Sequence, residues 1–304
     1  MIKPKALKKG SLLAVVSPAS TPKAELVAAG VARLEGLGYR VRVSAHALDK
    51  GPLYYAGTVE DRLADLHAAF ADPEVDGIVC ARGGWGSAEL LPGLDKELIR
   101  TNPKVFVGYS DLTSFQTWLW NEIGLVSFYA PMVAADFSRL DAAEMGSWES
   151  ALGGAEEWSV GAAEGLRVLR PGKAEGVLTG GCLSIYAEAL GTPYAAKAEG
   201  GILFLEDIGT KPYQWDRMLV HLRYAGMLKD VTGIVFGDME QNGADAEIEA
   251  SILHALREFE GPIGFGLRSG HVSVANVTLP LGVKVRLDLT GEPELRFVEA
   301  AVTR

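Results

Sequence analysis

The sequence predicts an α/β fold of two domains, and three observations lead to that prediction. Through the first half of the chain, short apolar runs alternate with segments whose apolar residues recur at helical spacing. The second half has apolar runs and helical segments of its own. The chain has 304 residues and is 48% hydrophobic, which suffices for two cores of ordinary size. We expect a first domain over residues 1–150, a linker over 151–172 and a second domain over 173–304.

Strands and helices alternate in order through the first domain. Its predicted strands are Leu12–Val16, Arg40–Ser44, Gly77–Cys80 and Val105–Val107. One predicted helix begins at about Pro22, and another begins at the capping pattern Thr58-x-x-Asp61. Their apolar faces carry Leu26, Val27, Val31 and Leu34 in the first helix and Leu63, Leu66 and Phe70 in the second. This order implies a parallel sheet covered by helices on both faces, with ligands beyond the carboxyl ends of its strands.

Two segments follow the third and fourth predicted strands and so belong to that ligand-binding edge. The first is Arg82-Gly83-Gly84-Trp85-Gly86, whose glycines would leave backbone amides free, as an oxyanion hole requires. A plain glycine turn has the same composition. The second is Ser110 in the stretch GYSDL, which resembles the G-x-S-x-G nucleophile elbow but lacks the second glycine. Ser110 is therefore either a nucleophile or the N-cap of the following helix.

The second half reads as a separate unit after an irregular, acidic and glycine-containing stretch. That stretch, from about Asp136 to Pro171, is interpreted as the linker. The predicted strands beyond it are Ile202–Leu205, Gly233–Phe236 and Val283–Leu289, and the predicted helices are about Tyr213–Tyr224 and Ala246–Phe259.

Composition and charge argue against several classes of protein. A net charge of -10 disfavours nucleic acid as a partner, and the glycines match neither a dinucleotide fingerprint nor a P-loop. Cys80 and Cys182 show no metal-ligand spacing with the five histidines, so we expect no metal or cofactor. The apolar run Leu12–Val16 is shorter than the roughly 7 to 15 residues of a signal peptide, and no segment approaches the ~20 residues of a membrane span. We therefore expect a cytoplasmic protein.

A nucleophilic serine needs a general base, and the base needs a group that orients it. Among the histidines, His271 stands out because it follows Gly270 in a loop of small and polar residues, where an imidazole can project into a cleft. Glu206 and Asp207 directly follow the apolar run GILFL, so they either meet a partner at the end of a strand or begin a surface loop. Ser110, Glu206 and His271 are the candidate set, although their spacing does not establish that they meet in space.

Longer stretches of the chain resemble the LD-carboxypeptidases, the muramoyltetrapeptide carboxypeptidase family of serine peptidases. The similar stretches cover most of both halves in the order found in the family. They are AGTVEDRLADLHAAFADPEVDGIVCARGGWGSAELL (56–91), FVGYSDLT (106–113), LTGGCLSIYAEALGTPY (178–194), ILFLEDIGTKPYQWDRMLVHLRYAGML (202–228) and GHVSVANVTLPLG (270–282).

This resemblance implies a fold, an activity and roles for particular residues. It implies a flavodoxin-like doubly wound N-terminal domain, a smaller β-rich α/β C-terminal domain, a site between them and commonly a homodimer. The family's nucleophile falls on Ser110, its glutamate on Glu206 and its histidine on His271, and the oxyanion is then expected at the amides of Gly84 and Asp111. The implied activity removes the terminal D-alanine from an L,D bond of murein tetrapeptides or larger muropeptides.

Three positions depart from the family pattern, and none of them belongs to the candidate set. Tyr129 begins Tyr-Ala-Pro where His-Gly-Pro is common, Cys182 stands where Asn is frequent, and Trp85 stands where Tyr is usual. Trp85 and Cys182 could line the cleft and affect substrate preference. The alternative within the family is an amidase that inactivates a peptide–nucleotide antibiotic, as microcin C immunity proteins do. The alternative from another class is a two-domain binding protein without chemistry, in which Ser110 is only a cap.

A carboxypeptidase must also bind the terminal carboxylate of its substrate, because an unpaired anion in a cleft is costly. Arg82, beside the oxyanion glycines, and Arg268, three residues before His271, are the candidates. Either arginine could instead belong to a structural ion pair.

Overall fold

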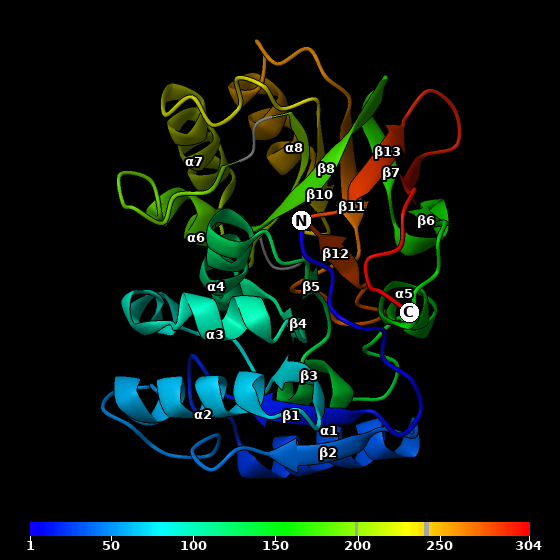
Figure 1. Ribbon diagram of the computed structural model, residues 1–304. Helices are drawn as coiled ribbons and strands as arrows, with labels where there is room; N and C mark the ends of the chain where they lie inside the picture. The colour runs from blue at the N-terminus through cyan, green and yellow to red at the C-terminus, as the bar shows by residue number, and fades with distance from the viewer. Residues whose placement is uncertain (198–199, 240–242) are drawn as a thin grey trace.

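Two β-sheets organise the molecule (Figure 1). The structure is a computed structural model that describes residues 1–197, 200–239 and 243–304. In this part of the chain a six-stranded sheet has the order β12-β5-β4-β3-β1-β2, and an eight-stranded sheet has the order β6-β14-β13-β8-β9-β10-β11-β7. In Figure 1 strands β1 to β4 of the first sheet lie in the lower part of the molecule, β5 and β12 lie at mid-height, and most of the second sheet lies above them.

The elements have the following bounds. The first sheet contains β1 (Leu12–Val16), β2 (Arg40–Val43), β3 (Val75–Cys80), β4 (Val105–Gly108), β5 (Ser127–Tyr129) and β12 (Leu279–Leu281). The second contains β6 (Trp158–Gly161), β7 (Arg167–Arg170), β8 (Lys173–Cys182), β9 (Gly201–Glu206), β10 (Gly233–Gly237), β11 (Ile263–Leu267), β13 (Lys284–Asp288) and β14 (Glu294–Phe297). The α-helices are α1 (Ala24–Gly36), α2 (Val59–Ala71), α3 (Lys96–Thr101), α4 (Thr113–Trp118), α5 (Met145–Gly153), α6 (Leu183–Glu188), α7 (Pro212–Tyr224) and α8 (Asp245–Ala255).

The first sheet confirms the predicted parallel α/β arrangement. Strands β1 to β5 pair in parallel in the spatial order 2-1-3-4-5, which is the flavodoxin-like order. Every residue of β1 and β4 is buried, as expected of strands covered by helices on both faces. The predicted cap of α2 is present as a full capping box, in which Thr58 and Asp61 exchange hydrogen bonds. None of the described helices is both long enough and apolar enough to cross a membrane.

Residues 151–172, which we expected to be a linker, contain two strands. β6 pairs antiparallel with β14 at one edge of the second sheet, and β7 pairs antiparallel with β11 at the other edge. Each of these edge strands has four residues, of which two at most are adjacent and apolar, so neither strand produces a continuous apolar run. This segment is therefore part of the eight-stranded sheet, and the exact domain limits stay a prediction.

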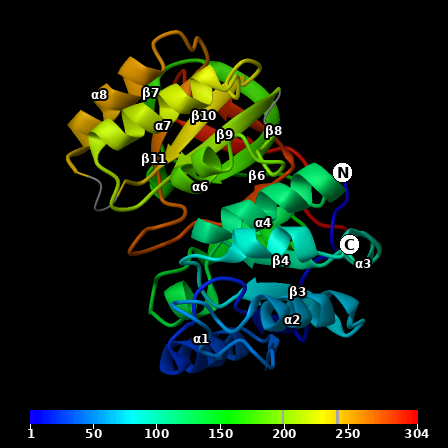
Figure 2. The same cartoon turned by 90° about the vertical axis from the view of Figure 1, so that its left-hand side faces the viewer.

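The chain crosses between the two sheets near its C-terminal end. β11 lies in the second sheet, while β12 pairs antiparallel with β5 at the edge of the first sheet. The intervening loop, residues 268–278, therefore connects the two sheets. Figure 2 shows α4 and α6 in the middle of the molecule, between the first sheet below and the outer helices α7 and α8 above. One hydrophobic core includes buried residues of both sheets, such as Phe106 and Phe204, which fixes the two layers against each other.

Candidate active site

Ser110 lies on a sharp turn between β4 and the next helical segment. Its φ is 66°, a left-handed value that is uncommon for a residue other than glycine. Such strained conformations concentrate at functional sites, and the serine of a nucleophile elbow has one. Tyr109, not Ser110, occupies the N-cap position of the 3₁₀ turn Ser110–Leu112. The hydroxyl of Ser110 instead lies 2.9 Å from Nε2 of His271.

The three candidate side chains, which are far apart in the sequence, meet at this turn. Nδ1 of His271 lies 2.9 Å from Oε2 and 3.1 Å from Oε1 of Glu206. The backbone N–H of His271 also donates to Oε2 of Glu206 at 3.1 Å. Ser110 comes from the end of β4, Glu206 from the end of β9 and His271 from the loop between the sheets. The serine, imidazole and carboxylate thus form one continuous hydrogen-bonded chain.

Glu206 is fully buried and is held by more than the imidazole. The hydroxyl of Tyr129 donates to Oε1 of Glu206 and accepts the backbone N–H of Ser110 at 3.1 Å. Burial raises the pKa of Tyr129 well above its usual range, so the phenol stays protonated and remains a donor. Tyr129 therefore connects the nucleophile turn to the carboxylate. The sequence marked Tyr129 only as a departure from the family pattern.

Hydrogen bonds through Asn276 hold the loop that carries His271 in place. The backbone N–H of Gly270 donates to Oδ1 of Asn276 at 2.9 Å, and Nδ2 of Asn276 donates to the buried Asp136 at 3.2 Å. Gly270 has φ 95°, and a Cβ there would lie 2.5 Å from Cδ of Glu206, so only glycine fits before the histidine. Burial raises the pKa of Asp136 to about 6.

The buried pair favours an ionised carboxylate beside a basic imidazole. Burial opposes the charge on Glu206, but the charge of His271 and the hydrogen bonds outweigh it, so the pKa of Glu206 is below its usual value. Burial likewise favours the neutral ring of His271, but the charge and hydrogen bond of Glu206 raise the pKa of His271 above its usual value. The imidazole is thus a stronger base than an isolated histidine.

The Gly83-Gly84 backbone lies directly against the nucleophile. A Cβ on Gly83 would lie 2.9 Å from Cβ and 3.1 Å from Oγ of Ser110. The hydroxyl of Ser20 accepts the N–H of Trp85 at 3.1 Å and so holds this turn in place. The carboxylate of Asp111 accepts the N–H of Ser87 at 2.8 Å, which joins the glycine turn to the nucleophile turn. The two segments that carry the predicted oxyanion amides of Gly84 and Asp111 are therefore adjacent.

A cavity of about 370 Å³ opens over this arrangement and is bordered by cations. Ser110, His271 and the two glycines line it, together with Lys23, Arg82 and Arg139. Arg82 donates from Nε to the carbonyl of its neighbour Gly83 at 3.2 Å, and Arg139 donates from Nε to the carbonyl of Ala135 at 2.9 Å. The sequence pointed to Arg82. Lys23 precedes α1 as its N-cap, and Arg139 follows the π-helical turn Val133–Phe137. Neither belongs to a motif, and both were missed.

Three further residues that the sequence analysis singled out lie elsewhere. Arg268 donates to the carbonyl of Ala163 at 2.6 Å and is not among the residues that line the cavity, so it is not placed to contact a ligand there. The side chain of Trp85, 40% exposed, borders a second and smaller cavity beyond the glycine turn. Cys182 is buried, and its backbone N–H donates to Oγ1 of Thr113 at 3.0 Å.

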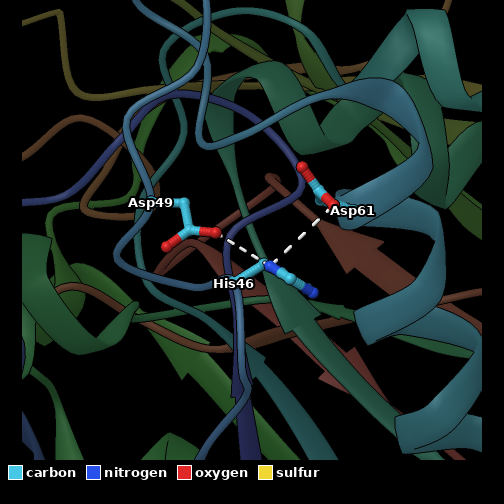
Figure 3. Close-up of side chains that lie close together, drawn as sticks. All are labelled: His46, Asp49 and Asp61. Carbon is cyan, nitrogen blue, oxygen red and sulfur yellow. Dashed lines mark hydrogen bonds and ion pairs between the residues drawn. The ribbon is translucent and has the colours of Figure 1, made fainter.

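Within the described residues, one group of side chains is close enough to share a metal ion. His46, Asp49 and Asp61 lie together at the start of α2 and in the loop before it (Figure 3). Nδ1 of His46 is 2.8 Å from Asp49 and 3.9 Å from Asp61, while the second oxygen of Asp61 accepts hydrogen bonds from Thr58. These contacts account for the cluster as a set of surface hydrogen bonds that fixes the loop to the helix.

Comparison with known proteins identifies the family. Residues 13–130 match the LD-carboxypeptidase N-terminal domain, and residues 175–287 match the LD-carboxypeptidase C-terminal domain. The chain is 37% identical to a Bacillus subtilis protein named "Probable murein peptide carboxypeptidase" over 99% of this chain and 95% of that protein.

Solved structures agree with this assignment. The crystal structure of a muramoyltetrapeptide carboxypeptidase from Oxalobacter formigenes superimposes with a TM-score of 0.85 at 30% identity, covering 96% of this chain and all of that one. An MccF-like protein from Bacillus anthracis superimposes with a TM-score of 0.92 at 27% identity, covering 98% of this chain and all of that one. The protein therefore belongs to the LD-carboxypeptidase family.

Proposed function

We propose that this protein is a serine carboxypeptidase that hydrolyses the L,D bond to the terminal D-alanine of murein tetrapeptides during cell-wall recycling. The observation that carries the proposal is the hydrogen-bonded chain from Ser110 Oγ through His271 to the buried Glu206. The names of the related proteins support the murein peptide as the substrate class.

The geometry supports an acyl-transfer mechanism. Oγ of Ser110 attacks the scissile carbonyl while Nε2 of His271 takes its proton, and Glu206 holds the Nδ1–H and the positive charge that forms. The amides of Gly84 and Asp111 bind the oxyanion, where one lost donor typically costs about 10² to 10³ in rate. His271 then gives the proton to the amine of D-alanine. A water molecule, activated by the same imidazole, attacks the acyl-enzyme and frees Ser110.

The cationic border of the cavity predicts which peptides are cut. A terminal carboxylate is expected to pair with Arg82 or Arg139, so tetrapeptides ending in D-alanine should be cut once to tripeptides. An amidated C-terminus, a terminal L-alanine or the D,D bond of a pentapeptide should be cut poorly. Mass spectrometry of the products from defined peptides measures this. Equal rates on the free and amidated tetrapeptides, or fast release of D-alanine from the pentapeptide, would refute carboxylate-dependent L,D specificity.

The pKa directions of the buried pair predict the pH profile. His271 must be neutral to accept a proton, and Glu206 raises the pKa of His271, so kcat/KM should fall on the acid side with a midpoint above about 6.5. The hydrogen bond from Tyr129 lowers the pKa of Glu206. Tyr129→Phe should make the carboxylate more basic and move the acid midpoint of the profile to higher pH.

A matched variant separates this effect from a general loss of stability. Tyr39→Phe removes a phenol that accepts a hydrogen bond from Trp148 at 3.1 Å, away from the catalytic residues, and should leave the midpoint unchanged. If Tyr129→Phe lowered the rate by the same factor at every pH, Tyr129 would not act through the Glu206–His271 pair.

Two experiments separate the proposal from its alternatives. An amidase of the microcin immunity kind would cleave aspartyl sulfamoyl adenosine faster than the tetrapeptide, and a binding protein would not react with a fluorophosphonate at Ser110.

A cytoplasmic location and a homodimer complete the proposal. The location rests on the recycled peptides that the proposal gives as the substrate, and the dimer rests on the family resemblance. Cell fractionation and sedimentation velocity test them.

A further inference from the structure

Arg62, in the first turn of α2, is a buried cation close to the glycine turn. Only 2% of its side chain is exposed. Nη2 donates to Oε2 of Glu89 at 2.9 Å, but the side chain of Glu89 is 43% exposed, so water screens this ion pair. Burying a guanidinium is costly unless its charge and its N–H groups are satisfied inside the protein. Glu89 therefore does not by itself account for the burial of Arg62.

Backbone carbonyls of two loops accept hydrogen bonds from Arg62. Nη1 donates to the carbonyl of Pro18 at 3.0 Å and to the carbonyl of Gly86 at 2.9 Å. Pro18 lies in the loop after β1, two residues before Ser20, whose hydroxyl accepts the N–H of Trp85. The guanidinium thus joins the loop after β1 to the glycine turn. Gly86 has φ 125°, and a Cβ there would lie 2.7 Å from Nη1, so a side chain at this position would displace Arg62.

Arg62 and Asp111 hold opposite ends of one peptide group. The carbonyl of Gly86, which Arg62 binds, belongs to the same peptide group as the N–H of Ser87. That N–H donates to Oδ2 of Asp111 at 2.8 Å, and Oγ of Ser87 donates to the backbone carbonyl of Asp111 at 2.7 Å. Burial raises the pKa of Asp111, while the hydrogen bonds of Ser87 and the charge of Arg62 oppose this rise. Hydrogen bonds in series strengthen one another in a low-dielectric interior, so the cation and the carboxylate both reinforce the contact between the two turns.

We propose that Arg62 is a positioning residue for the oxyanion site and acts through the peptide group that joins Gly86 to Ser87. The inference rests on the proposed function, in which the amides of Gly84 and Asp111 bind the oxyanion. These amides belong to separate turns, and the clamped peptide group fixes one turn against the other. Arg62 is not among the described residues that line the cavity over the nucleophile. Its loss should therefore weaken binding of the transition state and leave binding of the substrate unchanged.

The test compares two substitutions of Arg62. Arg62→Met removes the donors and keeps an unbranched side chain, so an oxyanion donor should shift and kcat on the tetrapeptide should fall about 100-fold, with KM within about threefold of wild type. Arg62→Lys keeps the charge and can donate to one of the two carbonyls, so it should lose only about 10-fold in kcat.

An inhibitor that mimics the tetrahedral intermediate separates positioning from a general structural role. A tripeptide boronate that forms an adduct with Ser110 should bind the Arg62→Met protein about 100-fold more weakly than it binds the wild type. In the Ser110→Ala background, the tetrapeptide should bind with the same affinity whether or not Arg62 is replaced. Inhibition kinetics and calorimetry measure the two affinities.

Two control variants identify which contact of Arg62 matters. Glu89→Gln removes only the exposed ionic partner and should leave kcat unchanged. Lys104→Met removes another buried cation, whose Nζ donates to the carbonyls of Asp72 and Val75. Lys104 directly precedes β4, at the opposite end of that strand from Ser110. Its loss should lower the thermal midpoint without lowering kcat.

A kcat for Arg62→Met within about threefold of wild type would overturn the inference. Equal losses of affinity for the boronate and the tetrapeptide, or a loss of kcat in Glu89→Gln as large as in Arg62→Met, would also overturn it. Should Arg62→Met not fold, Arg62→Lys allows the same comparisons. A wild-type protein that reacts with a fluorophosphonate at Ser110 but does not cut the tetrapeptide would refute the proposed substrate only, and the labelling rates of the variants would then test Arg62. A wild-type protein that does neither would refute the proposed function, and the inference with it.

Discussion

Replacing Ser110 by alanine is expected to lower kcat on the murein tetrapeptide by about 10⁴- to 10⁶-fold, the range seen when a serine nucleophile is removed. The reason is the position of its hydroxyl, 2.9 Å from Nε2 of His271, which in turn contacts the buried Glu206. The three groups act as a unit. The double variant Ser110→Ala with His271→Ala should therefore be scarcely slower than either single variant. Single-turnover kinetics with D-alanine detection measures these rates.

The folded state should survive the Ser110 substitution, because alanine keeps the Cβ of the serine at the same backbone position. We expect a thermal midpoint within a few degrees of the wild-type value, with an unchanged circular dichroism spectrum. Turnover within tenfold of wild type by purified Ser110→Ala protein would exclude the serine mechanism. Additive losses in the double variant would mean that Ser110 and His271 act in separate steps.

Replacing Gly83 by alanine should also have a large effect, although this residue takes no part in proton transfer. The added Cβ would lie 2.9 Å from Cβ and 3.1 Å from Oγ of Ser110, closer than such atoms normally approach. The serine or the glycine turn must move, and a displacement of about 1 Å in a catalytic arrangement can cost 10²-fold in rate. We expect kcat/KM to fall about 100-fold or more, with slower fluorophosphonate labelling of Ser110.

The matched control is Gly153→Ala in α5, where the new methyl group would meet no atom within 4 Å. It should leave kcat/KM unchanged. Full activity of the Gly83→Ala protein would show that the turn can retreat from Ser110 at no catalytic cost, and would argue against a role for the Gly84 amide in binding the oxyanion.

Local patterns in the sequence predicted the strands and helices that alternate in the first domain. The run Leu12–Val16 and the box at Thr58 and Asp61 report a buried strand and a helix start, and both are present as expected. Residues 158–161 and 167–170 gave no such signal, because a strand at a sheet edge is stabilised by its partner and not by its own composition. β12 was also missed, because a strand of three residues is too short to show a hydrophobic period.

Some residues of the candidate site could be predicted from the sequence, and others could not. Ser110, Glu206 and His271 were found because each lies just beyond a strand or in a loop of small residues and because longer stretches resemble a known family. Tyr129 and Arg139 could not be found by local reasoning. Tyr129 lies in an apolar strand as an ordinary buried aromatic residue, and only the pairing of sheets brings its hydroxyl to Glu206. Arg139 reaches the cavity because of how residues 133–137 turn beside α1.

The loop between β11 and β12 has a consequence for synthesis of the protein on the ribosome. Ser110 emerges early, but Glu206, His271 and the sixth strand of the first sheet come from the second half of the chain. The nucleophile has no carboxylate until Glu206 is made and no base until His271 is made, and β5 has no partner on its outer edge until residues 279–281 follow. The nascent chain is thus inert toward peptides in its surroundings. Peptide cleavage can therefore begin only after His271 has been made.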